Sequence, residues 1–141
     1  MIDPPNTPAP PAGGVLASPG ELASPGELAA LAAEAARSGD VETLARLLAA
    51  GVSPHTTTAR GDGLLMLAAY HGHAATVTGL AERGADVDRV NDRGQSPLAG
   101  AVFKDEAEVV TALLAAGADP DAGSPTARET AAMFGRPDLF G

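Results

Sequence analysis

The sequence contains no cysteine and no tryptophan, and only one tyrosine and three phenylalanines among its 141 residues. Without cysteine, the chain can form neither a disulfide bond nor a thiolate site. With so few aromatic side chains, the core must be built from alanine, leucine and valine. At about 25 cal/mol per Å² of buried apolar surface, such small side chains give a core of modest stability.

Positive charge and long apolar runs are also scarce. Nine basic residues stand against 18 acidic ones, which gives a net charge of −9, and Lys104 is the single lysine. This balance argues against generic nucleic-acid binding, which requires Lys and Arg to neutralise phosphates, and against an anionic membrane surface. The chain lacks an apolar run of about 18 residues and an N-terminal secretory signal pattern. We therefore expect no membrane span and a cytoplasmic location.

What the sequence does have is a period of 33 residues, marked by glycines. The first series ends three apolar runs, and two further pairs of glycines keep the same spacing. The positions are Gly51, Gly84 and Gly117, then Gly61 and Gly94, and Gly39 and Gly72. A fixed period of this length is typical of stacked-repeat solenoids. Such proteins present an extended concave surface for binding.

Two motifs recur with this period. Ser96-Pro97-Leu98 follows a glycine, and Gly84-Ala85-Asp86 and Gly117-Ala118-Asp119 follow apolar runs. In these features the chain resembles the ankyrin repeat, whose pattern is G-x-T-P-L-H-x-A-A, a second helix ending in L-L, and then G-A-D. The resemblance covers roughly residues 25–141, and the arginine-rich, alanine-rich composition suggests a small bacterial member. It implies an all-α solenoid of about 3.5 repeats, each a helix-turn-helix followed by a β-turn finger.

Four positions depart from the family pattern. Gly63-Leu64 replaces Thr-Pro, and Met66 and Ala99 stand where the family has histidine. Asp105 replaces the glycine expected between two paired helices.

Apolar periodicity predicts seven helices, at about 25–37, 41–49, 64–71, 74–82, 97–103, 106–115 and 127–134. Ser24 to Glu27, Asp105 to Glu108 and Thr126 to Glu129 fit capping boxes at three helix starts, and Ser96 precedes Pro97 at a fourth. In the first repeat, eight residues are expected to face the core: Leu28, Leu31, Ala32, Ala35, Val41, Leu44, Leu47 and Leu48.

These patterns divide the chain into two parts. Residues 1–23 are rich in Pro, Ala and Gly, include most of a duplicated L-A-S-P-G-E, and are expected to form a disordered arm. Residues 24–141 form the repeat domain, with repeats at about 24–57, 58–90 and 91–122. A truncated C-terminal cap at 123–141 aligns with a three-residue deletion. Phe134, Leu139 and Phe140 are expected to cover the last open face.

Catalytic and metal-binding patterns are weak. His71 and His73 form the one histidine cluster, but a metal site needs three or four ligands. The resemblance instead places His73 against the backbone of the turn and His71 on the exposed inner surface. Paired aspartates in the fingers lack the ligand run of a calcium loop and are interpreted as turn residues. We expect no catalytic residue, no metal and no cofactor.

The resemblance also indicates where a partner would bind. In ankyrin proteins, finger tips and the ends of the first helices contact partners. Matched through the glycines, these positions carry charged, polar and aromatic side chains: Ala59, Arg60, Asp62, Tyr70, His71, Asp92, Arg93, Gln95, Phe103 and Lys104. All but Ala59 are the predicted partner-binding residues. Aromatic and arginine side chains are enriched at binding hot spots. Alternatively, Tyr70 and Phe103 pack on neighbouring helices to supplement a poor core.

The sequence therefore predicts a non-catalytic protein–protein interaction module, monomeric, acting as a regulatory or accessory subunit that binds one partner through its concave face. The alternative is a metal- or small-molecule-linked stress-response protein that uses His71 and His73.

Overall fold

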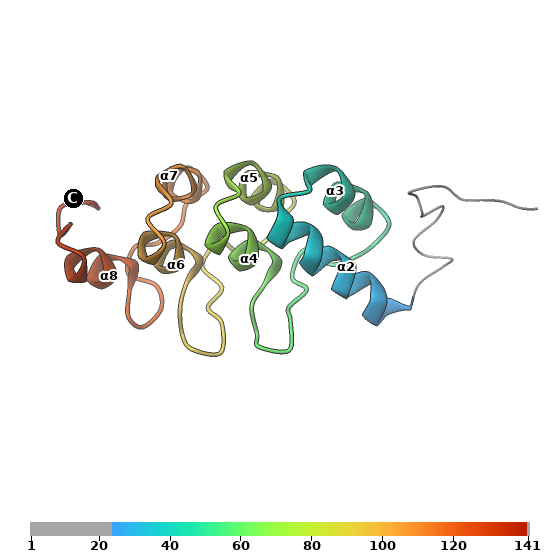
Figure 1. Cartoon of the computed structure of the whole chain (residues 1–141), viewed down its shortest axis with the longest axis horizontal. Coiled ribbons are helices and arrows are strands. Elements are labelled where there is room, and N and C mark those ends of the chain that lie inside the picture. The colour runs from blue at the N-terminus through green and yellow to red at the C-terminus, as the bar shows by residue number, and fades with distance from the viewer. Residues whose placement is uncertain (1–23, 141) are drawn as a thin grey trace, which may run out of the picture.

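The computed structural model describes residues 24–140, so the expected arm at 1–23 lies outside the described residues. Seven α-helices follow one another in this range (Figure 1): α2 (Pro25–Ser38), α3 (Val41–Ala49), α4 (Leu64–Tyr70), α5 (Ala74–Glu82), α6 (Pro97–Phe103), α7 (Ala107–Ala115) and α8 (Ala127–Met133). All seven predicted helices are present, and their bounds agree with the predictions to within about one residue. The predicted all-α repeat solenoid is confirmed. None of these helices is long and apolar enough to cross a membrane.

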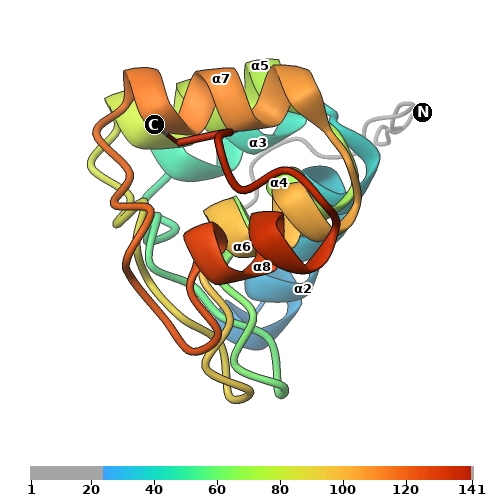
Figure 2. The same cartoon turned by 90° about the vertical axis from the view of Figure 1, so that its left-hand side faces the viewer.

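The helices form two parallel rows. The first helices of the repeats, α2, α4, α6 and α8, lie in one row, and α3, α5 and α7 lie in the other (Figures 1 and 2). Each helix packs mainly on its partner within the repeat and on the equivalent helix of the next repeat. The long connections between repeats extend away from the second row as fingers beside the first row (Figure 2). The repeats thus offer two kinds of exposed element along one side, helix ends and finger tips.

Local sequence determines where the helices begin. Ser24 and Glu27 form a reciprocal capping box, with 3.2 Å from the Glu27 amide to the Ser24 hydroxyl and 2.8 Å from the Ser24 amide to the Glu27 carboxylate. Thr126 and Glu129 form the same arrangement at α8, and the buried hydroxyl of Ser96 accepts from the Ala99 amide at α6. These three predicted caps are confirmed. They satisfy backbone donors that a helix start leaves unpaired.

The predicted capping box at Asp105 and Glu108 is wrong. The N-cap of α7 is Glu106, and no side chain caps that helix. Asp105 has φ 58°, so it adopts the left-handed conformation of the glycine that it replaces. Its carboxylate instead accepts from Arg136 at 2.8 Å. The position is therefore governed by the turn that ends α6, which leaves Asp105 unable to begin α7.

The core consists of small aliphatic side chains, as the composition requires. Leu64, Leu80, Leu98 and Leu113 are almost completely inaccessible and repeat along the stack. In the first repeat Ala32, Ala35, Leu44 and Leu47 are buried as predicted, while Leu28 and Leu48 are half-buried.

Two first-repeat predictions are wrong. Leu31 is 46% exposed and Val41 40% exposed. Both lie in the first of the described repeats, which packs on a neighbour at one side only within residues 24–140. An amphipathic pattern identifies the apolar face of a helix, but it does not say whether a neighbouring repeat covers that face.

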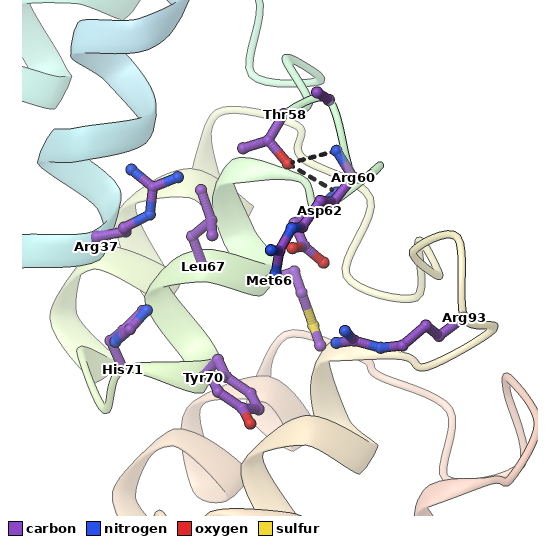
Figure 3. Close-up of a pocket in the computed structure, with 10 residues that line it drawn as sticks. Arg37, Thr58, Arg60, Asp62, Met66, Leu67, Tyr70, His71 and Arg93 are labelled. Atoms are coloured by element: carbon purple, nitrogen blue, oxygen red, sulfur yellow. Dashed lines mark hydrogen bonds between the residues drawn. The ribbon is translucent and has the colours of Figure 1, made fainter.

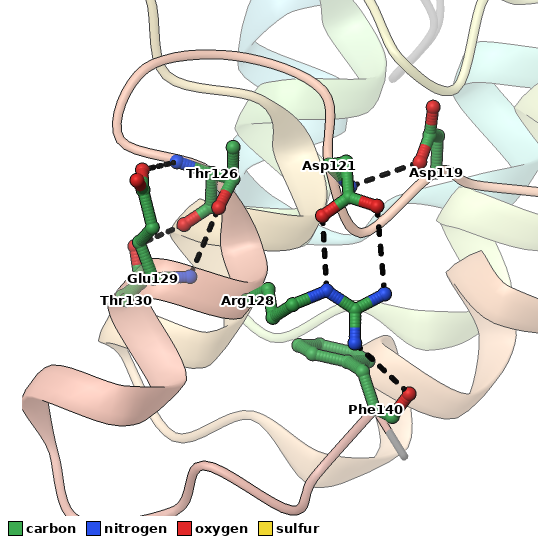
Figure 4. Close-up of polar contacts among 7 residues, drawn as sticks. All are labelled: Asp119, Asp121, Thr126, Arg128, Glu129, Thr130 and Phe140. Atoms are coloured by element: carbon green, nitrogen blue, oxygen red, sulfur yellow. Dashed lines mark hydrogen bonds and ion pairs between the residues drawn. The ribbon is translucent and has the colours of Figure 1, made fainter.

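The last repeat confirms the predicted three-residue deletion, because α8 begins 30 residues after α6, whereas α6 begins 33 after α4. Arg128 joins the shortened finger to the chain beyond α8 (Figure 4). It contacts Asp121 at 2.9 Å and 3.5 Å and the Phe140 carbonyl at 3.3 Å. The hydrogen bond with Asp121 raises the pKa of the Arg128 guanidinium above its usual value.

The predicted cover of the last repeat is confirmed in part. Leu139 and Phe140 pack against the core. Phe134 does not join them. It is 51% exposed and lies edge-on to Phe103, with ring centroids 5.7 Å apart.

Candidate interaction surface

The ends of the first helices place bulky side chains in a row. Tyr70, Phe103 and Met133 are the last residues of α4, α6 and α8, so the repeat places them in equivalent positions. Tyr70 is half-buried, whereas Phe103 and Met133 are 52% and 66% exposed. Together with Phe134, the last two form an apolar patch, here called the apolar end (Phe103, Met133 and Phe134). The ends of consecutive first helices thus change in character along the stack.

Tyr70 owes its position to a glycine in the next repeat. A side chain at Gly100 would stand 2.9 Å from the Met66 Cε atom and 3.5 Å from the Tyr70 ring. Gly100 therefore lets Met66 and Tyr70 pack closely on α6. The ammonium of Lys104 lies 5.0 Å from the centre of the Tyr70 ring, in a cation–π arrangement. For Tyr70, both the packing and the binding interpretations of the sequence keep support.

The finger of the second repeat is built around Thr58. Its hydroxyl accepts from the amides of Arg60 and Asp62, both at 3.3 Å, and its backbone amide donates to the Asp62 carbonyl at 2.9 Å. These bonds hold the tip residues Ala59 and Arg60 in a tight turn. An isolated antiparallel bridge between Thr57 and Gly63 closes the finger at its base. The sequence therefore displays Arg60 on a backbone fixed by its own hydrogen bonds.

Asn91 links this finger to the next one. It is only 6% exposed, and its amide group donates to the Asp62 carboxylate at 2.9 Å. Its side-chain oxygen accepts from the amides of Arg93 and Gln95 at 2.9 Å and 3.1 Å. One buried asparagine thus fixes the spacing of the two fingers and orients the turn that carries Arg93.

An open groove of about 610 Å³ lies between the fingers and the first helices. Five of the nine predicted partner-binding residues line it: Arg60, Asp62, Tyr70, His71 and Arg93. Figure 3 shows Arg93 reaching from its finger toward Met66, which lies on α4. A further arginine, Arg37 near the end of α2, completes the lining. The groove therefore brings together side chains from three repeats.

The four other predicted residues lie beside the groove. Gln95 accepts from the Arg93 guanidinium at 3.5 Å. Asp92 is exposed and its carboxylate lies against Gly61 of the preceding finger. Phe103 belongs to the apolar end, and Lys104 lies over Tyr70. Thus Asp92 resembles a spacer between fingers, and the other three extend the groove toward the C-terminal repeats.

Positive charge predominates in the groove. Three arginines line it against one carboxylate, Asp62, in a chain whose net charge is −9. That carboxylate is already engaged by Asn91. Arg37 contacts Glu34 at 3.4 Å, but both side chains are exposed, and such i,i+3 surface pairs contribute little.

The two clustered histidines do not form a joint site. The His73 ring bonds the Arg37 carbonyl at 2.8 Å, so it joins the first repeat to the second, as the prediction of a turn contact requires. His71 is exposed in the groove and lies edge-on to Tyr70, with ring centroids 5.8 Å apart. Within residues 24–140 no group of three or more His, Asp or Glu side chains is placed to hold a metal ion.

The aspartates of the fingers contact backbone amides, as the turn interpretation requires. Asp86 accepts from the Asp88 amide at 2.9 Å, and Asp119 from the Asp121 amide at 2.9 Å. Asp88 reaches the next finger and accepts from the Asp119 amide at 2.8 Å.

Sequence reasoning missed Arg37, Asn91 and Met133. Arg37 could have been found by extending the series Tyr70 and Phe103 one period back, since it lies 33 residues before Tyr70. Met133 follows from the same series once the three-residue deletion is allowed. Asn91 carries no comparable signal, because its role depends on a bond to Asp62 in the preceding finger.

The comparison with protein families agrees with this geometry. A family model described as ankyrin repeats (3 copies) matches residues 32–124. A search among curated proteins finds no match.

Proposed function

Because the chain belongs to the ankyrin-repeat family, whose repeats are protein–protein interaction modules and typically non-enzymatic, we propose that it binds one partner protein through its concave face. In this proposal the chain acts as a regulatory or accessory subunit and performs no catalysis. The binding surface comprises the groove, Lys104 and the apolar end. The partner-binding residues are those predicted from the sequence, with Arg37 added.

The observation that carries the proposal is the composition of this one face. Three arginines and a lysine lie beside exposed aromatic side chains on a molecule that is otherwise acidic. Arginine and aromatic residues are the types that most often dominate binding energies. Phe103 supports the binding interpretation because half of its surface remains exposed, which a residue kept only for packing does not need.

The proposal is tested by affinity capture from a lysate of the protein's own cells, with bound proteins identified by mass spectrometry. We expect Tyr70→Ala with Phe103→Ala to abolish capture of the specific partner. Arg60→Glu with Arg93→Glu should weaken capture more at low salt, because exposed charges are screened over about 10 Å at ~0.1 M salt.

Matched controls lie on the second row of helices. Arg46 in α3 and Arg83 at the end of α5 are both exposed. Arg46→Glu with Arg83→Glu changes the net charge by the same amount, and Val41→Ala removes an exposed apolar side chain. Thermal melts of all variants separate lost binding from lost folding. Equal recovery with the concave-face and control variants would reject this face as the binding site.

A further inference from the structure

The groove collects arginines from three successive repeats. Arg37 comes from the end of α2, Arg60 from the finger before α4, and Arg93 from the finger before α6. Figure 3 shows the three side chains around the same hollow, above the α4 residues Met66 and Leu67. Since each arginine belongs to a different repeat, their positions relative to one another are held by the stack and by Asn91.

Their charges have little compensation within the described part of the chain. No carboxylate among residues 24–140 pairs with Arg60 or Arg93 within 4.0 Å, and Arg93 contacts only the neutral Gln95. Asp62 is the one acidic lining residue, and it accepts from Asn91. Three like charges in one hollow repel one another, and an anion placed among them relieves that repulsion. Guanidinium groups also match carboxylates in geometry, because they can donate two parallel hydrogen bonds.

The apolar end continues this surface toward the last repeat. Phe103 and Phe134 contact each other, and with Met133 they expose half or more of their surfaces. Tyr70, under the Lys104 ammonium, lies between the groove and the apolar end. A segment lying along the first helices therefore meets cations first and apolar side chains second.

We propose that the groove binds an acidic segment of the partner protein, whose carboxylates contact Arg37, Arg60 and Arg93 and whose adjacent bulky apolar side chain contacts the apolar end. This inference rests on the proposed function and names the chemistry of the segment that the concave face recognises. The order of the two patches also gives the segment one direction along the stack.

A nucleic acid fits this surface less well. Its phosphates form a continuous line of negative charge, and binding requires many neutralised phosphates. Here the cations are confined to one groove, while Asp62 and Asp92 lie on its fingers and the whole chain carries −9. A protein segment with a few carboxylates followed by apolar residues matches both patches.

Fluorescence anisotropy with defined peptides tests the inference on the full-length protein. The probe is a labelled peptide of consecutive glutamates followed by leucine and phenylalanine. We expect saturable binding that weakens as salt rises. Arg60→Gln with Arg93→Gln should weaken it by about tenfold, as the loss of two ion pairs allows. Phe103→Ala with Met133→Ala should weaken it without changing the salt dependence.

Three controls make the result decisive. Arg46→Gln with Arg83→Gln should leave the affinity unchanged, and circular dichroism melts verify that each variant is folded. A peptide with glutamine in place of glutamate should not bind, and one with its order reversed should bind more weakly. Equal binding of the glutamate and glutamine peptides, no binding of either, or tighter binding of a labelled single-stranded oligonucleotide would overturn the inference.

The two proposals fail in different ways. If the peptides do not bind but capture from the lysate still requires Tyr70 and Phe103, the concave face binds a partner of another chemistry. If deleting residues 1–22 reveals peptide binding that the full chain lacks, the chain's own acidic residues in that segment occupy the groove, and the inference of a partner segment is overturned.

Discussion

The turns between helices show how a single atom is positioned at the residue scale. Gly39 ends the first helix of its repeat with φ 75°, and a Cβ there would stand 2.5 Å from the His73 ring nitrogen. That ring is held by its bond to the Arg37 carbonyl. Gly84 has a similar φ of 91°, yet nothing lies within 4 Å of its missing side chain. The two glycines therefore share backbone strain on substitution but differ in the space around them.

We predict that Gly39→Ala destabilises the protein more than Gly84→Ala. Both lose about 1–2 kcal/mol because alanine disfavours the left-handed conformation. Gly39→Ala also displaces His73, and a lost hydrogen bond of this kind costs about another 0.5–1.5 kcal/mol. Urea midpoints measure the difference, and the NMR signals of the His73 ring should shift in the first variant only. Equal losses in both variants would show that the His73 contact adds nothing to stability.

Asp40 combines a structural role with a pH dependence. It is the N-cap of α3 and accepts from the Thr43 amide at 3.1 Å. Hydrogen bonding by Thr43, from its side chain and then its backbone, holds the pKa of Asp40 below its ordinary value of 3.8. Because the folded pKa is depressed, the stabilisation is complete above pH 3.8 and is lost as the pH falls through the lower folded value.

We predict that Asp40→Ala lowers stability at neutral pH by about 1 kcal/mol, the usual loss of an N-cap. Asp40→Asn keeps a capping side chain that does not titrate, so it should stay close to the wild type. The difference between wild type and Asp40→Ala should narrow as the pH falls below about 4. Urea titrations along this pH series measure it. A difference that stays constant to low pH would show that the charged form of Asp40 does not stabilise the cap.

At the scale of the element, each second helix presents one narrow buried face. In α7, Leu113 is completely buried, whereas its neighbour Leu114 is 39% exposed. Val109 and Leu113 lie four residues apart and both face the core, as helical spacing requires. Because the core is built of small residues, a few leucines account for a large share of its buried area.

We predict that Leu113→Ala costs about 2–5 kcal/mol, the usual range for a buried leucine. Leu114→Ala, one residue away in the same helix, should cost less than about 1 kcal/mol, because most of its transfer free energy was never gained. Both variants remove the same atoms at similar helix propensity. Chemical denaturation with urea compares them. Similar losses would contradict the assigned orientation of α7.

The helices and their order were predictable because each depends on local signals. Apolar periodicity, the caps at Ser24, Ser96 and Thr126, and the glycine period all operate within one repeat. Predictions failed where the outcome depended on a neighbour. The exposure of Leu31 depends on what covers the first repeat, and the role of Asp105 depends on the turn before it.

The candidate site follows the same division. The period predicted Arg60, Tyr70, Arg93 and Phe103, since equivalent positions lie at equivalent places in the stack. It could not predict that Asn91 bonds Asp62 across two fingers, which takes three-dimensional contact. Whether these residues bind a partner stays a prediction.

At the scale of the whole molecule, charge and stability are both distributed unevenly. The cationic groove lies on a chain of net charge −9, so the local field at the groove opposes that of the remainder. Such a field steers an oppositely charged partner and raises the rate of association at low salt. Stability depends on the stack, since each repeat packs on its neighbours and the outer repeats need some cover.

We predict that the two ends of the chain differ in what they contribute to stability. Deleting residues 137–141 removes Leu139 and Phe140, which pack against the core, and the Phe140 carbonyl that Arg128 contacts. For two partly buried side chains the loss should be about 2 kcal/mol. Deleting residues 1–22 keeps the capping box of Ser24 and Glu27 and should leave the urea midpoint unchanged. An N-terminal deletion that lowers the midpoint as much as the C-terminal one would show that the segment packs on the repeats. The repeat domain would then begin before Ser24.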